Sequence, residues 1–192
     1  MSTLWIARHA PVAIAGVCYG RTDVPVLRAS ADAAELLART FPVATRPEIV
    51  WSSTTARCRA VAADLARAWS VEERVDDRLC ELDFGRWEGR AWNEIESSDP
   101  DAYARWMRDW RVVAPPGGES PQQLERRARR WLNALDGRRT HALVAHAGFV
   151  RALRVVLNGT DWEAAMRTEV PHLCWRLMSF TSKREGLDRE PA

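Results

Sequence analysis

Five side chains in this sequence have the chemistry and the spacing to act on a phosphate group. They stand at the expected ends of strands or starts of helices, or close to them: Arg8, His9, Arg57, Glu81 and His146. Arginines and a protonated histidine neutralise a phosphoryl dianion, an imidazole can act as the nucleophile, and a carboxylic acid can protonate the leaving oxygen. The sequence has no glycine loop of the Walker type and no clustered metal-binding carboxylates, so we expect phosphate chemistry without a metal or cofactor.

Two expected strands end in a histidine. The apolar run 4–7 predicts a buried strand, and Arg8-His9 follows it directly. The run 141–145 predicts another buried strand, and it ends in His146-Ala147-Gly148. Because ligands of open α/β folds bind outside the carboxyl ends of the strands, both histidines are placed for chemistry. Gly148 would let backbone N–H groups approach a ligand closely.

Arg57 lies in the first turn of a helix expected over 56–69. A cation there opposes the helix dipole, so the local electrostatics give no reason for it. A bound anion would, because the free N–H groups of the helix and the guanidinium would converge on it. The alternative is a solvated arginine.

Glu81 and Arg21 complete the candidate residues. Glu81 stands between Cys80 and Leu82, an apolar neighbourhood that suits a general acid, and the alternative is an exposed carboxylate. Arg21 lies in a long loop over 11–28 that has no helix of its own, and such loops often carry function. We weigh a substrate contact for Arg21 against a surface ion pair with Asp23.

The order of the expected elements predicts the fold class. Strands alternate with helices, which favours an α/β sandwich of three layers with a mostly parallel central sheet covered on both faces. A length of 192 residues suits one domain, so we expect a single domain over 1–192 with a disordered polar tail from about residue 183. The expected strands cover 4–8, 48–51, 141–145 and 173–180, and the helices 30–41, 56–69, 92–111, 121–135 and 149–157.

Composition excludes several function classes. The net charge is +2, and no strongly basic face stands out, so nucleic acid is not an expected partner. The four cysteines are scattered without a CxxC pair, which favours reduced structural thiols over a zinc site. No apolar run is long enough to cross a membrane, and Arg8 and His9 interrupt the only stretch resembling a signal peptide. We expect a cytoplasmic protein, monomeric or homodimeric.

Taken together, five short segments resemble the histidine phosphatase superfamily, in its phosphoglycerate mutase-like branch. They occur in the order of that family and cover residues 4 to about 158. The segments are Arg8-His9, Ser52-Ser53 with Arg57, Glu81-x-x-Phe84-Gly85 with Trp87-Glu88-Gly89, Gly117-Gly118-Glu119-Ser120, and His146-Ala147-Gly148. The stretch 18–25 further resembles the α-ribazole phosphatase group.

The resemblance implies a role for each residue. His9 would be the nucleophile that takes the phosphoryl group, and Glu81 would give a proton to the leaving alcohol. Arg8, Arg57 and His146 would hold the phosphate oxygens, and the backbone at Ala147 would add a hydrogen bond. The implied partner is a small phosphate ester, with α-ribazole 5′-phosphate as the specific substrate.

Two other functions and one departure from the family pattern remain open at this point. A phosphoglycerate mutase is the second enzyme hypothesis, and a non-catalytic module that binds phosphate or phosphoproteins is the third. Ala10 and Pro11 replace the glycine and polar residue that usually follow the family's histidine, so their contacts to phosphate are open. The tryptophans near Glu81 are either core and lid packing or a platform for a nucleoside-like base: Trp87, Trp92, Trp106 and Trp110.

Overall fold

A five-stranded sheet forms the centre of the residues that the computed structural model describes, which are 2–42 and 46–180. The expected polar tail lies outside them. The strand order is β3-β2-β4-β1-β5, with only β5 antiparallel to its neighbour, so the mostly parallel sheet is confirmed. The strands are β1 (Ser2–Arg8), β2 (Ile49–Ser52), β3 (Glu72–Val75), β4 (Thr140–Ala145) and β5 (Trp175–Phe180).

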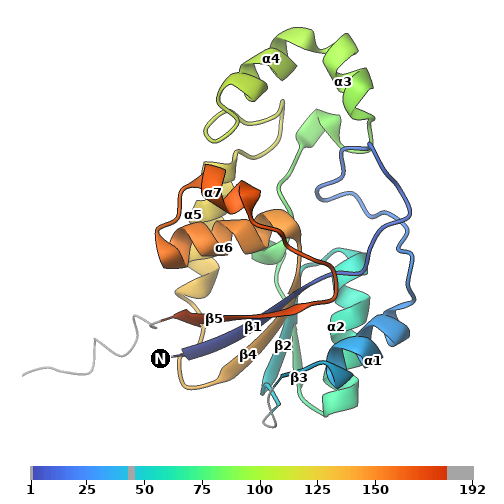
Figure 1. Cartoon of the computed structure of the whole chain (residues 1–192), viewed down its shortest axis with the longest axis vertical. Helices are drawn as coiled ribbons and strands as arrows, with labels where there is room; N and C mark the ends of the chain where they lie inside the picture. The colour runs from blue at the N-terminus through green and yellow to red at the C-terminus, as the bar shows by residue number, and fades with distance from the viewer. Residues whose placement is uncertain (1, 43–45, 181–192) are drawn as a thin grey trace, which may run out of the picture.

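Helices cover both faces of this sheet (Figure 1). The helices α1 (Ser30–Arg39) and α2 (Ala56–Trp69) pack on one face through small and apolar side chains such as Ala33 and Leu65. The helices α5 (Pro121–Leu132), α6 (Ala147–Asn158) and α7 (Trp162–Arg167) cover the other. This arrangement confirms the three-layer sandwich.

Two short helices stand beyond the sheet at one end of the molecule, α3 (Trp92–Ser98) and α4 (Pro100–Arg108) (Figure 1). They have a small core of their own, in which Trp87 and Ile95 are fully buried. The sequence predicts one helical stretch here, but Pro100 divides it. Proline has no N–H to donate inside a helix and suits the first helical position, where it begins α4.

One strand and one α-helix have no counterpart in the sequence-based prediction. The strand β3 reads Glu-Glu-Arg-Val, and every residue in it is exposed, because it lies at the edge of the sheet. The helix α7 is only six residues long. The strand β3 lacks the apolar alternation by which half-buried strands are recognised, and α7 is too short for a helical period to stand out.

The register of the sheet brings the two candidate histidines together. β1 and β4 pair in parallel with Arg8 opposite Ala145, so the next residue of each chain segment emerges at the same edge. The backbone N–H of His9 donates to the carbonyl of Ala145 at 2.9 Å. The rings of His9 and His146 consequently lie with their centroids 5.3 Å apart.

Candidate active site

The side chain of His9 is buried, at 2% exposure, and its Nδ1 lies 2.7 Å from the carbonyl oxygen of Ala10. A carbonyl oxygen can only accept, so Nδ1 carries the proton and the neutral ring keeps its lone pair on Nε2. Burial lowers the pKa of His9 to about 3, and the charges of Arg57 and Arg8 add to this effect against the hydrogen bond to Ala10. His9 is therefore a neutral imidazole with a free nucleophilic nitrogen at neutral pH.

His146 lies next to His9 and is fully buried. Its Nε2 is 2.8 Å from Ser53 Oγ and 3.3 Å from Thr55 Oγ1. Burial holds the pKa of His146 well below its usual range, and the charge of Arg57 reinforces the shift. The hydroxyls that precede α2 therefore orient a histidine, while Thr55, at the N-cap of α2, makes no side-chain cap.

Arg57 is buried and is held by the loop that follows β1. Its guanidinium donates to the carbonyl of Thr22 at 2.7 Å and also to the carbonyl of Gly20. The ring of Tyr19 lies under it, with its centroid 5.6 Å from Cζ. Asp23 accepts from the Ala56 N–H at 2.8 Å, which ties the same loop to the start of α2. The long loop thus fixes the orientation of Arg57.

The carboxylate of Glu88 also holds this loop, through its backbone N–H groups. It accepts backbone N–H groups from Gly20, Arg21, Thr22 and Phe84 at distances of 2.9–3.1 Å. Burial would raise the pKa of Glu88, but these hydrogen bonds outweigh it and lower the pKa. Glu88 therefore holds, through the backbone, the two carbonyl groups that orient Arg57.

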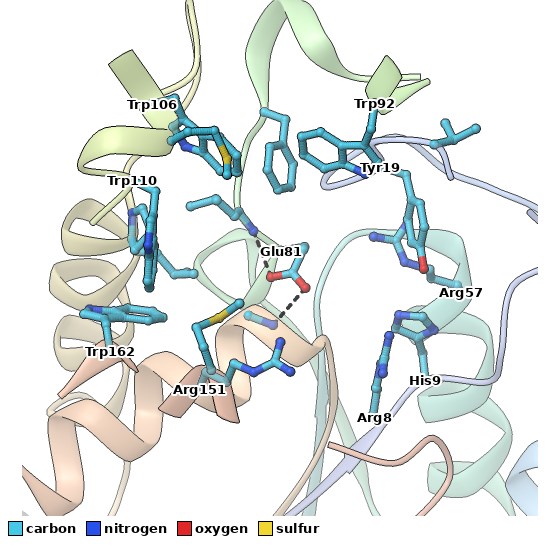
Figure 2. Close-up of a pocket in the computed structure, with 18 residues that line it drawn as sticks. Arg8, His9, Tyr19, Arg57, Glu81, Trp92, Trp106, Trp110, Arg151 and Trp162 are labelled. Carbon is cyan, nitrogen blue, oxygen red and sulfur yellow. Dashed lines mark hydrogen bonds between the residues drawn. The ribbon is translucent and has the colours of Figure 1, made fainter. Parts of the chain in front are cut away.

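Glu81 lies across the cavity from His9, and two backbone groups hold its carboxylate (Figure 2). Oε1 accepts from the N–H of Leu82 at 3.0 Å, and Oε2 accepts from the N–H of Gly148 at 2.9 Å. The close approach depends on a glycine, because a Cβ at position 148 would lie 2.2 Å from Oε1. Gly148 therefore makes room for Glu81, and its expected role toward a ligand stays a prediction.

Arg127 holds the backbone of the segment that carries Glu81. It forms an ion pair with Glu119 at 2.6 Å and donates to the carbonyls of Arg78, Cys80 and Glu81. Its place on α5 lies between Leu124 and Trp131, on the apolar face of the helix. Arginine on a helix is usually exposed, but Arg127 is buried, and its spacing from Leu124 and Trp131 is the sequence signal for that burial.

A cavity of about 570 Å³ lies between His9 and Glu81, whereas His146, Glu88 and Arg127 are not in its lining. Arg8, His9 and Arg57 line one side of it, Glu81 lies across from them, and aromatic and methionine side chains line much of the rest (Figure 2). The aromatic and methionine side chains are Tyr19, Phe84, Trp92, Trp106, Met107, Trp110, Trp162 and Met166. The cavity therefore combines an anion-binding end with a large apolar wall.

Three further residues named from the sequence are not in the cavity lining: Ala147, Arg21 and Trp87. Ala147 is the first residue of α6, beside Gly148. Arg21 does not line the cavity, and its guanidinium lies 3.6 Å from Asp83 and 3.8 Å from Asp77. Trp87 is fully buried in the small core, with its ring N–H 3.3 Å from Asp99, so of the four tryptophans it alone does not line the cavity.

Within the described residues, no cluster of histidine, cysteine, aspartate and glutamate could hold a metal ion. None of the helices in that part of the chain is long and apolar enough to cross a membrane.

Comparison with known proteins decides the family. Residues 4–190 match the histidine phosphatase superfamily (branch 1). The chain belongs to this superfamily. It is 26% identical over 177 residues to the adenosylcobalamin/alpha-ribazole phosphatase of Salmonella typhimurium, covering 90% of this chain and 87% of the relative. The crystal structure of the alpha-ribazole phosphatase from Shigella flexneri superposes with a TM-score of 0.82 at 24% identity, over 93% of this chain and 91% of that one.

A shorter stretch resembles a longer protein. Over 81 residues the chain is 43% identical to the bifunctional protein Rv2228c of Mycobacterium tuberculosis, which is 42% of this chain and 22% of that protein. The chain thus matches less than a quarter of that relative. The resemblance that the motifs indicate, to the superfamily and to the α-ribazole phosphatases, is confirmed by these comparisons.

Proposed function

We propose that the protein hydrolyses phosphate monoesters through a phosphohistidine at His9. The observation that carries this proposal is the hydrogen bond from His9 Nδ1 to Ala10, which leaves Nε2 unprotonated beside Arg8 and Arg57. Glu81 stands in the same cavity as a proton donor. The membership of the histidine phosphatase superfamily supports the same reaction.

In the first step, Nε2 of His9 attacks phosphorus and the bond from phosphorus to the ester oxygen breaks. Glu81, protonated, gives its proton to the leaving alcohol. Arg8 and Arg57 stabilise the charge on the transferred phosphoryl group, and we assign His146 and the backbone at Ala147 to the same group.

In the second step, water attacks the phosphohistidine. Glu81, now a carboxylate, takes a proton from that water, and the P–N bond breaks to release inorganic phosphate. His9 returns to its neutral form, with the proton still on Nδ1. One carboxyl group thus serves both steps, and its two hydrogen bonds from backbone N–H groups hold it in place throughout.

The specific substrate that we propose first is α-ribazole 5′-phosphate. The stretch 18–25, the named relatives and the aromatic wall support it. Trp92 and Trp106 stack on each other at the wall, with ring centroids 5.8 Å apart and planes at 16°. Such rings can pack against a planar base.

The test is phosphate release from a panel of esters that includes α-ribazole 5′-phosphate and p-nitrophenyl phosphate. The wild-type protein should release phosphate, whereas His9→Ala should not. Net isomerisation of 3-phosphoglycerate in the presence of a bisphosphoglycerate primer would instead indicate a mutase. Binding of phosphate without turnover of any ester would indicate a binding module.

A further inference from the structure

Arg151 is a cation in the cavity that has no partner in the described part of the chain. Five arginines have a buried Nε without a hydrogen bond: Arg8, Arg21, Arg57, Arg151 and Arg176. The other four all have a carbonyl or carboxylate contact through the same guanidinium. Arg151 has neither a hydrogen bond nor an ion pair among the described residues.

Its position on α6 directs it toward the reacting groups. Arg151 lies one turn after Ala147, lines the cavity, and extends its guanidinium to the side of Glu81 that faces Arg8 (Figure 2). Burial lowers the pKa of Arg8, and the charge of Arg151 contributes to that lowering. The Glu81 carboxylate accepts from the N–H groups of Leu82 and Gly148 and forms no ion pair with Arg151.

Arg151 differs from the other two arginines of the cavity in having no protein group opposite its charge. Arg57 lies 3.9 Å from the carboxylate of Asp23, and Arg8 donates to the carbonyl of Val170. Arg151 has no such partner among the described residues, so its guanidinium is available to an anionic group of a ligand.

We propose that Arg151 binds a second anionic group, a carboxylate or phosphate, on the leaving alcohol. This inference rests on the proposed phosphatase function and makes Arg151 a specificity-determining residue. A guanidinium suits this task because it recognises carboxylate and phosphate with two parallel hydrogen bonds. α-Ribazole 5′-phosphate, which we propose above from the relatives and the aromatic wall, offers no second anion. At Arg151, a comparable ester that carries a carboxylate should therefore bind better than it does.

The experiment compares two esters of similar size, 3-phosphoglycerate and glycerol 3-phosphate, which differ in one carboxylate. The wild-type protein should prefer 3-phosphoglycerate in kcat/KM, and Arg151→Gln should reduce that preference about tenfold or more. Arg151→Lys should keep part of the preference, because it keeps the charge. Arg154→Gln, on the same helix but outside the cavity, should not change it.

Binding to His9→Ala, measured by calorimetry with and without Arg151→Gln, gives the same comparison without turnover. An equal loss for both esters would overturn the inference, since Arg151 would then serve the transferred phosphate. A wild-type protein with no preference for the carboxylate would also overturn it. The proposed function fails separately, if His9→Ala still hydrolyses p-nitrophenyl phosphate.

Discussion

The carboxylate of Glu81 is held 2.9 Å from the backbone N–H of Gly148, so closely that any side chain at position 148 would displace it. Gly148→Ala should consequently displace the carboxylate of the proton donor without changing residue 81 itself. We expect kcat for an alkyl phosphate to fall about a hundredfold, the scale of general acid catalysis.

The same variant should be less impaired with p-nitrophenyl phosphate, whose leaving group needs less protonation. Glu81→Gln should show the same difference between the two esters. Alanine suits a helix better than glycine does, so the melting temperature should not fall in parallel with activity. Equal losses for both esters would contradict the role of Glu81 as the donor.

Glu88 does not line the cavity, yet it holds the loop whose carbonyls orient Arg57. In Glu88→Gln the amide NH₂ would face backbone N–H donors, and the loop would lose hydrogen bonds to a charged acceptor. We expect KM and the inhibition constant of inorganic phosphate to rise about tenfold or more, with a smaller change in kcat.

Glu94→Gln is the matched control for this measurement. Glu94 is exposed and forms a surface ion pair with Arg90, so its neutralisation should leave phosphate inhibition unchanged. If Glu88→Gln bound phosphate as tightly as the wild-type protein, the link from Glu88 to Arg57 would be disproved.

Three buried histidines make stability depend on pH. Burial lowers the pKa of His9, His141 and His146 below the value of about 6.5 that they have in an unfolded chain. The unfolded state therefore binds more protons below that pH, and the free energy of unfolding should fall as pH drops from about 7 toward about 5. Each histidine contributes up to about 1.4 kcal/mol per pH unit.

Urea denaturation at several pH values measures this slope. His9→Asn removes one of the titrating groups, so its slope should be shallower than that of the wild-type protein. A free energy of unfolding that stays constant or increases on acidification over this range would show that the histidines are not held neutral.

The sheet and its two histidines could be predicted because the evidence for them is local. An apolar run predicts each strand, and its end places His9 or His146 at the edge. Glu88 belongs to a motif that the sequence shows. Its hydrogen-bond partners could not be predicted, because the backbone N–H groups at 20–22 lie far from it in the chain.

Residues that are buried by pairing, or left unpaired in a cavity, were harder to predict. Arginine is usually exposed, yet Arg127 is buried, because Glu119 and three carbonyls compensate its burial. Arg151 could be recognised only once the cavity showed which groups surround it. Trp87 and Trp92 are similar in sequence context, and only the packing of α3 and α4 separates core from cavity wall.

The central claim is that Nε2 of His9 carries the phosphoryl group during turnover. The most direct measurement is mass spectrometry and NMR of protein quenched in alkali during turnover of a phosphate ester. The account predicts an acid-labile phosphoryl group on His9, bonded to Nε2 and absent from His9→Ala. Phosphorylation at another residue, or turnover that continues in His9→Ala, would contradict it.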